Sequence, residues 1–99
     1  MTTALTLTTG QDAAGALVLT AVGEIDMSNA ETFAAALGEA VTDDGRPVLV
    51  DLTAVEYLDS AGLATLFQHA GRIEVVTGPL LAPLLTVSGL GDLTTVRGS

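Results

Sequence analysis

A serine followed by two small residues stands where a segment of helical spacing begins. Ser60 lies between Asp59 and Ala61-Gly62, and apolar residues then recur at Leu63, Leu66, Phe67 and Ala70. Backbone N–H groups at a helix start have no intrahelical partner, and serine is a favoured N-cap there. The Ser60 hydroxyl therefore has two compatible interpretations. It is an N-cap, or it is an accessible hydroxyl that accepts a phosphate, whose charge the helix N-terminus would favour.

The other side chains that carry chemistry are scattered. Asp26 and Asp59 are a carboxylate pair for acid–base work, but no third group converges with them in sequence, so solvated loop carboxylates or helix caps are the better interpretation. Asp51 is an ordinary strand-end residue, and His69 has no second ligand or nucleophile at useful spacing. Gly89-Leu90-Gly91 lacks the basic residue and the preceding strand of a phosphate loop. The sequence therefore predicts no enzyme, no metal site and no cofactor.

Length and charge limit the function further. The chain has 99 residues, 48% of them apolar, which predicts one domain over residues 1–99 with one modest core. Twelve acidic residues face three arginines, giving a net charge of −9. Such a chain repels phosphate backbones and anionic membranes, so we expect no nucleic-acid binding, no direct membrane binding, and a protein partner with a basic patch.

Cysteine is absent, which excludes disulfides and thiolate chemistry. The first residues lack the basic segment and long apolar run of a signal peptide, and no apolar run is long enough for a membrane span. A cytoplasmic location is the expectation.

Alternating and apolar runs predict up to five strands. The expected strands are Leu5–Thr8, Ala16–Val22, Val48–Leu52, Ile73–Thr77 and a short last strand at Thr94–Val96. Between the second and third strands, Ser28 and Glu31 form a capping box for a first helix, which Thr42-Asp43-Asp44-Gly45 stops.

The second helix starts at Ser60 and ends near Gly71. A third helix has Pro83 in its first turn and ends at Ser88, with Gly89 as a left-handed cap. The alternation predicts an α/β fold, in which a small mixed sheet of four to five strands is covered by three helices.

Four segments in order resemble the STAS domain family, and within it the bacterial anti-sigma factor antagonists (anti-anti-sigma factors). The most specific is Asp59-Ser60-Ala61-Gly62-Leu63. The supporting segments are Gly23–Asp26, Val50–Leu58 and Leu85–Leu90. The family fold agrees with the α/β prediction. Compared with relatives, the second helix and its following loop are short, and the usual C-terminal helix is expected to be truncated.

The resemblance implies a phosphorylation switch in transcription regulation. In that family, the serine matching Ser60 is phosphorylated by an anti-sigma factor with serine kinase activity. The unphosphorylated antagonist binds that kinase and thereby frees a sigma factor, and a phosphatase resets the cycle. The resemblance implies a partner-binding surface of Asp26, Ser28, Asp59, Ser60, Ala61, Gly62 and Leu63.

Other functions stay open from the sequence. A STAS accessory subunit of an ABC-type lipid transporter resembles the same serine motif but docks on an ATPase without needing a phosphate. A STAS binding module without a phospho-switch, or one that senses a nucleotide or other ligand, is a further alternative. A bare apolar sheet edge would favour association, including a homodimer.

Overall fold

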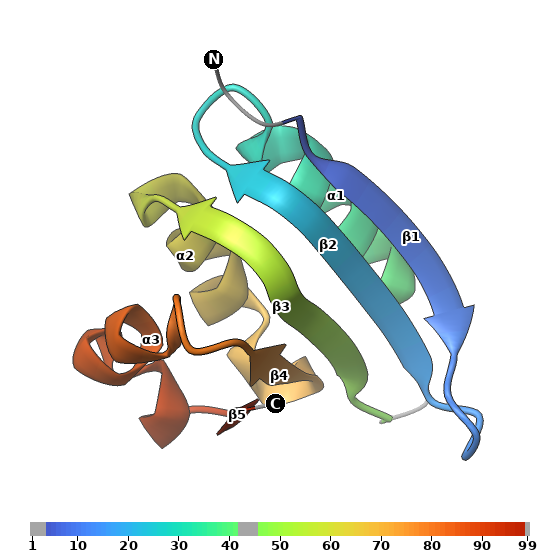
Figure 1. Cartoon of the computed structure of the whole chain (residues 1–99). Coiled ribbons are helices and arrows are strands. Elements are labelled where there is room, and N and C mark those ends of the chain that lie inside the picture. Colours follow the sequence, from blue (N-terminus) through green and yellow to red (C-terminus); the bar gives the residue numbers. More distant parts are fainter. Residues whose placement is uncertain (1–3, 42–45, 99) are drawn as a thin grey trace.

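The computed structural model describes residues 4–41 and 46–98 and shows a five-stranded sheet with three α-helices (Figure 1). The expected helix stop at 42–45 lies outside the described residues. In chain order the elements are β1 (Thr6–Gln11), β2 (Leu17–Ile25), α1 (Ala30–Ala40), β3 (Val48–Leu58), α2 (Ser60–Gln68), the 3-10 turn η1 (Ala70–Arg72), β4 (Ile73–Thr77), α3 (Ala82–Ser88), the 3-10 turn η2 (Leu90–Asp92) and β5 (Thr95–Gly98). The mixed α/β prediction is confirmed.

The strands lie in the sheet in their sequence order, β1-β2-β3-β4-β5. β1 pairs antiparallel with β2, and the other three pairs are parallel. A tight turn makes the first pair possible, because the Asp12 carboxylate accepts hydrogen bonds from the backbone N–H groups of Ala14 and Ala16. Gly15 completes this turn with φ of +86°, which a residue with a Cβ rarely adopts.

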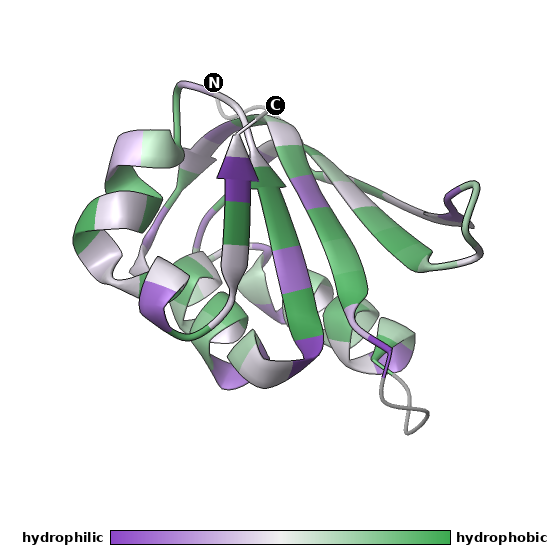
Figure 2. Ribbon diagram, turned by 90° about the horizontal axis from the view of Figure 1, so that it is seen from below, coloured by the Kyte–Doolittle hydropathy of each residue, from purple (hydrophilic) through white to green (hydrophobic). Residues whose placement is uncertain are grey.

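The core lies on one face of the sheet, where α1 and α2 cover it (Figure 2). Alternate residues of the three central strands point into it, and Phe33 and Leu37 of α1 are fully buried against them. Residues of the intervening register, such as Val18 and Thr20, are only half-buried. The sheet therefore has one packed face, and its parallel strands bring their carboxyl ends to a common edge.

β2 and β3 run further than the sequence pattern indicates. The pattern predicts ends at Val22 and Leu52, but the strands continue to Ile25 and Leu58. Register shifts between Thr20 and Val22 and between Gly23 and Glu24 change which residues face the core. Because these irregularities break the period of two, the buried residues after Leu52 are Val55 and Leu58. Each is three residues after the last, so the sequence pattern does not indicate a strand there.

The second half of the chain follows the sequence pattern closely. β4 spans Ile73–Thr77 as expected, and Pro83 lies in the first turn of α3. Gly89 ends that helix with φ of +83°, the left-handed cap that the sequence predicts. Buried Leu85 and Leu90 then attach this region to the core.

Candidate functional site

The carboxyl ends of β2 and β3 bring two distant segments together. Ile25 pairs with Leu58 at the end of the parallel register. One step further, the backbone N–H of Asp59 donates a 3.1 Å hydrogen bond to the carbonyl of Ile25. The loop of residues 26–29 and the first turn of α2 thus leave the sheet from adjacent positions. We call this region the carboxyl edge and define it as residues 24–29 and 56–63.

Asp59, rather than Ser60, caps α2. The Asp59 carboxylate accepts hydrogen bonds from the backbone N–H of Ala61 at 2.9 Å and of Gly62 at 3.1 Å, while its backbone is extended. The expectation of Ser60 as the N-cap is therefore wrong by one residue. The physical reason is tertiary: the hydrogen bond from the Asp59 N–H to the Ile25 carbonyl holds Asp59 in the extended geometry of an N-cap, so the helix already begins at Ser60.

Ser60 is the first residue of α2 and is exposed. Its hydroxyl makes no hydrogen bond to any residue in the described ranges 4–41 and 46–98. Because Asp59 satisfies the free backbone donors, the serine side chain has no structural role at the helix start. A hydroxyl that is accessible and unbonded is chemically available to another molecule.

The residues after Ser60 pack the first turn of α2 against the sheet. Gly62 is buried, and a Cβ there would lie 2.5 Å from Leu58 Cδ1 and 2.7 Å from Ile25 Cγ2. This close approach requires glycine, and it fixes the first turn of α2 against the ends of β2 and β3. Ala61 and Leu63 are half-buried, with Leu63 packed against the core.

A compact hydrogen-bonded loop follows β2. The Asp26 carboxylate accepts from the backbone N–H of Ser28 at 2.8 Å and from its hydroxyl at 2.5 Å. Asn29 closes the loop on both sides, since its Oδ1 accepts from the backbone N–H of Asp26 and its Nδ2 donates to the carbonyl of Glu24, each at 2.9 Å. The side chains that sequence analysis placed here are thus held in one fixed arrangement.

The expected capping box at the start of α1 is wrong. The N-cap is Asn29, and no side-chain hydrogen bond caps this helix. Ser28 is exposed, and its hydroxyl donates to Asp26 while its oxygen accepts no hydrogen bond from the backbone N–H groups of α1. The Asp26–Ser28 contact wins because it satisfies a charged acceptor, and hydrogen bonds to charged groups are about twice as strong as neutral ones.

The same contact sets the acidity of Asp26. The hydrogen bond from the Ser28 hydroxyl, followed by the one from the Ser28 backbone N–H, holds the pKa of the Asp26 carboxyl below its ordinary value of 3.8. The loop therefore presents a carboxylate that is charged at all physiological pH values. Together with Asp59 it makes the carboxyl edge acidic.

Two exposed apolar residues of the carboxyl edge were missed by sequence analysis. Met27 is 82% exposed between Asp26 and Ser28, and Tyr57 is 49% exposed near the end of β3. The signal for Met27 was an apolar residue between two polar loop residues, Asp26-Met27-Ser28. For Tyr57 no signal was present, because its exposure depends on the irregular register of β3.

The remaining candidates lie apart from this edge. Asp51 accepts hydrogen bonds from the Thr53 backbone N–H and hydroxyl within β3, and His69 Nδ1 lies 3.1 Å from the Thr65 carbonyl oxygen. Within the described parts of the chain, no three His, Asp or Glu side chains gather into a metal site. No helix in those same ranges is long and apolar enough to cross a membrane.

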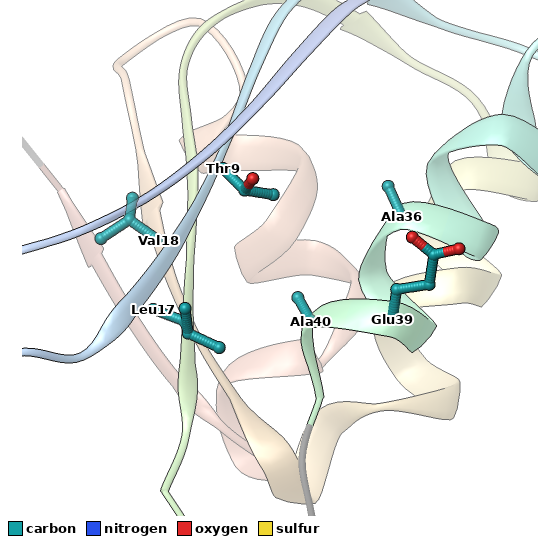
Figure 3. Close-up of a pocket in the computed structure, with 6 residues that line it drawn as sticks. All are labelled: Thr9, Leu17, Val18, Ala36, Glu39 and Ala40. Carbon is teal, nitrogen blue, oxygen red and sulfur yellow. The ribbon is translucent and has the colours of Figure 1, made fainter.

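A cavity of about 280 Å³ lies between α1 and the β1–β2 hairpin, with Thr9, Leu17 and Val18 across from Ala36, Glu39 and Ala40 (Figure 3). It lies at the amino end of β2, the opposite end from Ile25. This cavity is therefore separate from the carboxyl edge.

Comparison with known proteins identifies the family of this chain. Residues 9–95 match the sequence profile of the family described as "Mlab, STAS domain". The chain belongs to the STAS domain family. A crystal structure of an anti-sigma factor antagonist from Mycobacterium paratuberculosis is 30% identical, with a TM-score of 0.84 over 95% of this chain and 86% of that chain.

Two further relatives are informative. The anti-sigma-F factor antagonist RsfB of Mycobacterium tuberculosis is 41% identical over 59 residues, which cover 60% of this chain and 48% of RsfB. The chain thus spans about half the length of the curated relatives it matches. The anti-sigma factor antagonist SpoIIAA in its unphosphorylated form shares the fold, with a TM-score of 0.73 over 95% of this chain and 88% of that chain at 17% identity.

Proposed function

We propose that this chain is an anti-sigma factor antagonist whose binding is controlled at Ser60. With Ser60 unphosphorylated, it binds an anti-sigma factor that has serine kinase activity, and a sigma factor is freed. Phosphorylation of Ser60 by that kinase ends the binding, and a phosphatase restores it. The chain acts in this cycle as a binding protein rather than as an enzyme.

One observation carries the proposal. The Ser60 hydroxyl is exposed and unbonded at the start of α2, because Asp59 caps the helix in its place. A kinase can reach such a hydroxyl without unfolding the domain. The names of the RsfB and Mycobacterium paratuberculosis relatives, both anti-sigma factor antagonists, support the class of partner.

The charges explain how one phosphate would end binding. Phosphorylation adds about 1.5 to 2 negative charges beside Asp59. A partner surface that fits the unmodified Ser60 hydroxyl has no group placed to pair with a phosphate there. Burying the phosphate charge in such an interface costs several kcal/mol. About 4 kcal/mol corresponds to a thousandfold change in affinity. Within the domain, the helix N-terminus offsets part of the cost, so the fold survives.

A pull-down with four forms of the chain tests the proposal. Wild type, Ser60→Ala, Ser60→Asp and Ala13→Asp are used as baits in lysate of the source cells, and bound proteins and phosphopeptides are identified by mass spectrometry. Ala13→Asp is the matched control, because it adds the same charge at the exposed β1–β2 turn, at the opposite end of β2. Circular dichroism confirms that each variant is folded.

We expect wild type, Ser60→Ala and Ala13→Asp to retain a serine-kinase anti-sigma factor, and Ser60→Asp to lose it. Phosphate is expected on Ser60 only in the fraction of wild type that has released the kinase. Retention of the kinase by Ser60→Asp would refute the switch. Equal recovery of a transporter ATPase by all four baits would instead favour the accessory-subunit function.

A further inference from the structure

Several large apolar side chains are exposed to solvent instead of being buried in the core. In residues 4–41 and 46–98 they are Val22, Met27, Tyr57, Leu80, Leu84, Val87 and Leu93. Two of these, Met27 and Tyr57, belong to the carboxyl edge. Met27 follows Ile25 by two residues and Tyr57 precedes Asp59 by two, and the hydrogen bond between Ile25 and Asp59 joins the two segments.

Both side chains are presented on fixed backbone. Hydrogen bonds from Asp26, Ser28 and Asn29 hold the loop on either side of Met27. Tyr57 lies in the paired part of β3, opposite Glu24. A fixed backbone lowers the ordering cost of binding, so an exposed apolar residue here contributes more of its burial energy to a complex.

Acidic residues are frequent in the two segments that carry Met27 and Tyr57. Glu24, Asp26, Glu56 and Asp59 all belong to the carboxyl edge. Arg46 and Arg72 precede β3 and β4, so they lie at the opposite, amino edge of the parallel strands. The edge thus combines two apolar side chains with negative charge, and tyrosine and methionine are residue types enriched in the centres of protein interfaces.

We propose that Met27 and Tyr57 are the apolar anchors of the surface centred on Ser60, and that the partner presents an apolar pocket bordered by cationic side chains. This inference rests on the proposed function and names the chemistry of its partner at the same surface. We infer the cationic border from the negative charge of the carboxyl edge, and the apolar pocket from the two exposed apolar side chains.

The two apolar anchors also determine why a phosphate on Ser60 would weaken the complex. Apolar contacts around a central residue exclude water, so a charge at Ser60 would lose its hydration in the complex. Repulsion between exposed charges is largely screened at 1 M salt, where the Debye length is about 3 Å. A desolvation penalty is screened much less. The affinity difference between Ser60 and a charged residue there therefore persists at high salt.

Calorimetric titration tests the proposal, with the purified serine-kinase anti-sigma factor that Ser60→Ala retains as the probe. It is titrated with wild type, Met27→Ser, Tyr57→Thr, Ser60→Asp and Val87→Ser. Threonine keeps a strand-forming residue at position 57. Val87→Ser is the matched control, because Val87 is 87% exposed but lies on α3.

We expect Met27→Ser and Tyr57→Thr each to weaken binding about tenfold or more, and Val87→Ser to leave it within about twofold. Wild type and Ser60→Asp should differ by a similar factor at 0.1 M and 1 M sodium chloride. Wild-type affinity in both anchor variants, with Ser60→Asp still binding much more weakly than wild type, would overturn this inference and leave the proposed function standing. Normal binding by Ser60→Asp would overturn the proposed function itself.

Discussion

The N–H of Asp59 donates a hydrogen bond of 3.1 Å to the carbonyl of Ile25, which links the N-cap of α2 to the end of β2. This bond extends the parallel pairing of β2 and β3 by one step beyond Ile25 and Leu58. It places the Asp26 loop beside the first turn of α2. The geometry around Ser60 therefore depends on how closely that turn packs against the two strand ends.

Gly62 makes this packing possible, so Gly62→Ala should destabilise the domain. The added Cβ would collide with the ends of Leu58 and Ile25 at 2.5 and 2.7 Å. The leucine tip can rotate, but Ile25 is fully buried and β-branched, which leaves it little freedom. We expect a loss of about 1 to 3 kcal/mol in the free energy of unfolding, measured by denaturant titration.

Gly38→Ala is the control for that measurement. Gly38 lies inside α1 and is exposed, and a Cβ added to it would have no atom of another residue within 4 Å in the described structure, apart from its own helix. Alanine there should stabilise the domain by up to about 1 kcal/mol, because it favours the helix. Equal effects of the two substitutions would contradict the packing role of Gly62.

The assignment of the α2 cap predicts opposite sensitivities at two adjacent residues. Asp59→Ala removes the acceptor for two backbone N–H groups and should cost about 1 kcal/mol of stability. Ser60→Ala should change stability by less than about 0.5 kcal/mol, since its hydroxyl has no partner in the described structure. Thermal or denaturant unfolding of both variants measures the difference. A larger loss for Ser60→Ala would restore the serine as the cap.

The closure of the Asp26 loop depends on Asn29. Asn29→Ala removes the acceptor for the Asp26 N–H and the donor to the Glu24 carbonyl. We expect a loss of about 1 to 2 kcal/mol in the free energy of unfolding, because these partly buried groups lose their partners. Glu31→Ala is the control and should cost about half a kcal/mol or less, as expected for a lone charge in a first helical turn. A larger loss of stability for Glu31→Ala than for Asn29→Ala would instead favour the capping box.

The acidity of Asp26 gives a prediction that NMR can test. Its pKa should be below 3.8 in the folded chain and should rise in Ser28→Ala, which removes the larger of the hydrogen bonds that lower it. Because the folded pKa is the lower one, the stabilisation is complete above the unfolded value and is lost as the pH falls through the folded value. An unchanged Asp26 titration in Ser28→Ala would exclude the hydroxyl as the cause.

Sequence alone predicts the fold class, β4, α3 and the place of the serine motif, because these depend on local periodicity and on glycine and proline. It does not predict the lengths of β2 and β3. Their outer residues pair through an irregular register that only the neighbouring strand defines, so Val55 and Leu58 do not follow the alternation of Val50 and Leu52.

The sequence also predicts the two N-caps wrongly, for a related reason. Asp59 and Ser60 are both good caps, as are Ser28 and Asn29, and local sequence cannot choose between adjacent residues of similar capping ability. The choice depends on contacts across the sheet, such as the bond from Asp59 to Ile25. Sequence locates the start of α2 to within one residue. Tertiary structure decides that Asp59 is the cap, and this leaves the Ser60 hydroxyl unbonded.

Tyr57 gives the carboxyl edge an intrinsic optical reporter. The chain contains one tyrosine and no tryptophan, so its emission on excitation in the tyrosine absorption band, where phenylalanine does not absorb, originates from a single phenol ring that is 49% exposed. Any molecule that covers this ring changes the polarity around it. Fluorescence of the unlabelled chain would therefore follow docking at this edge directly, without interference from the rest of the domain.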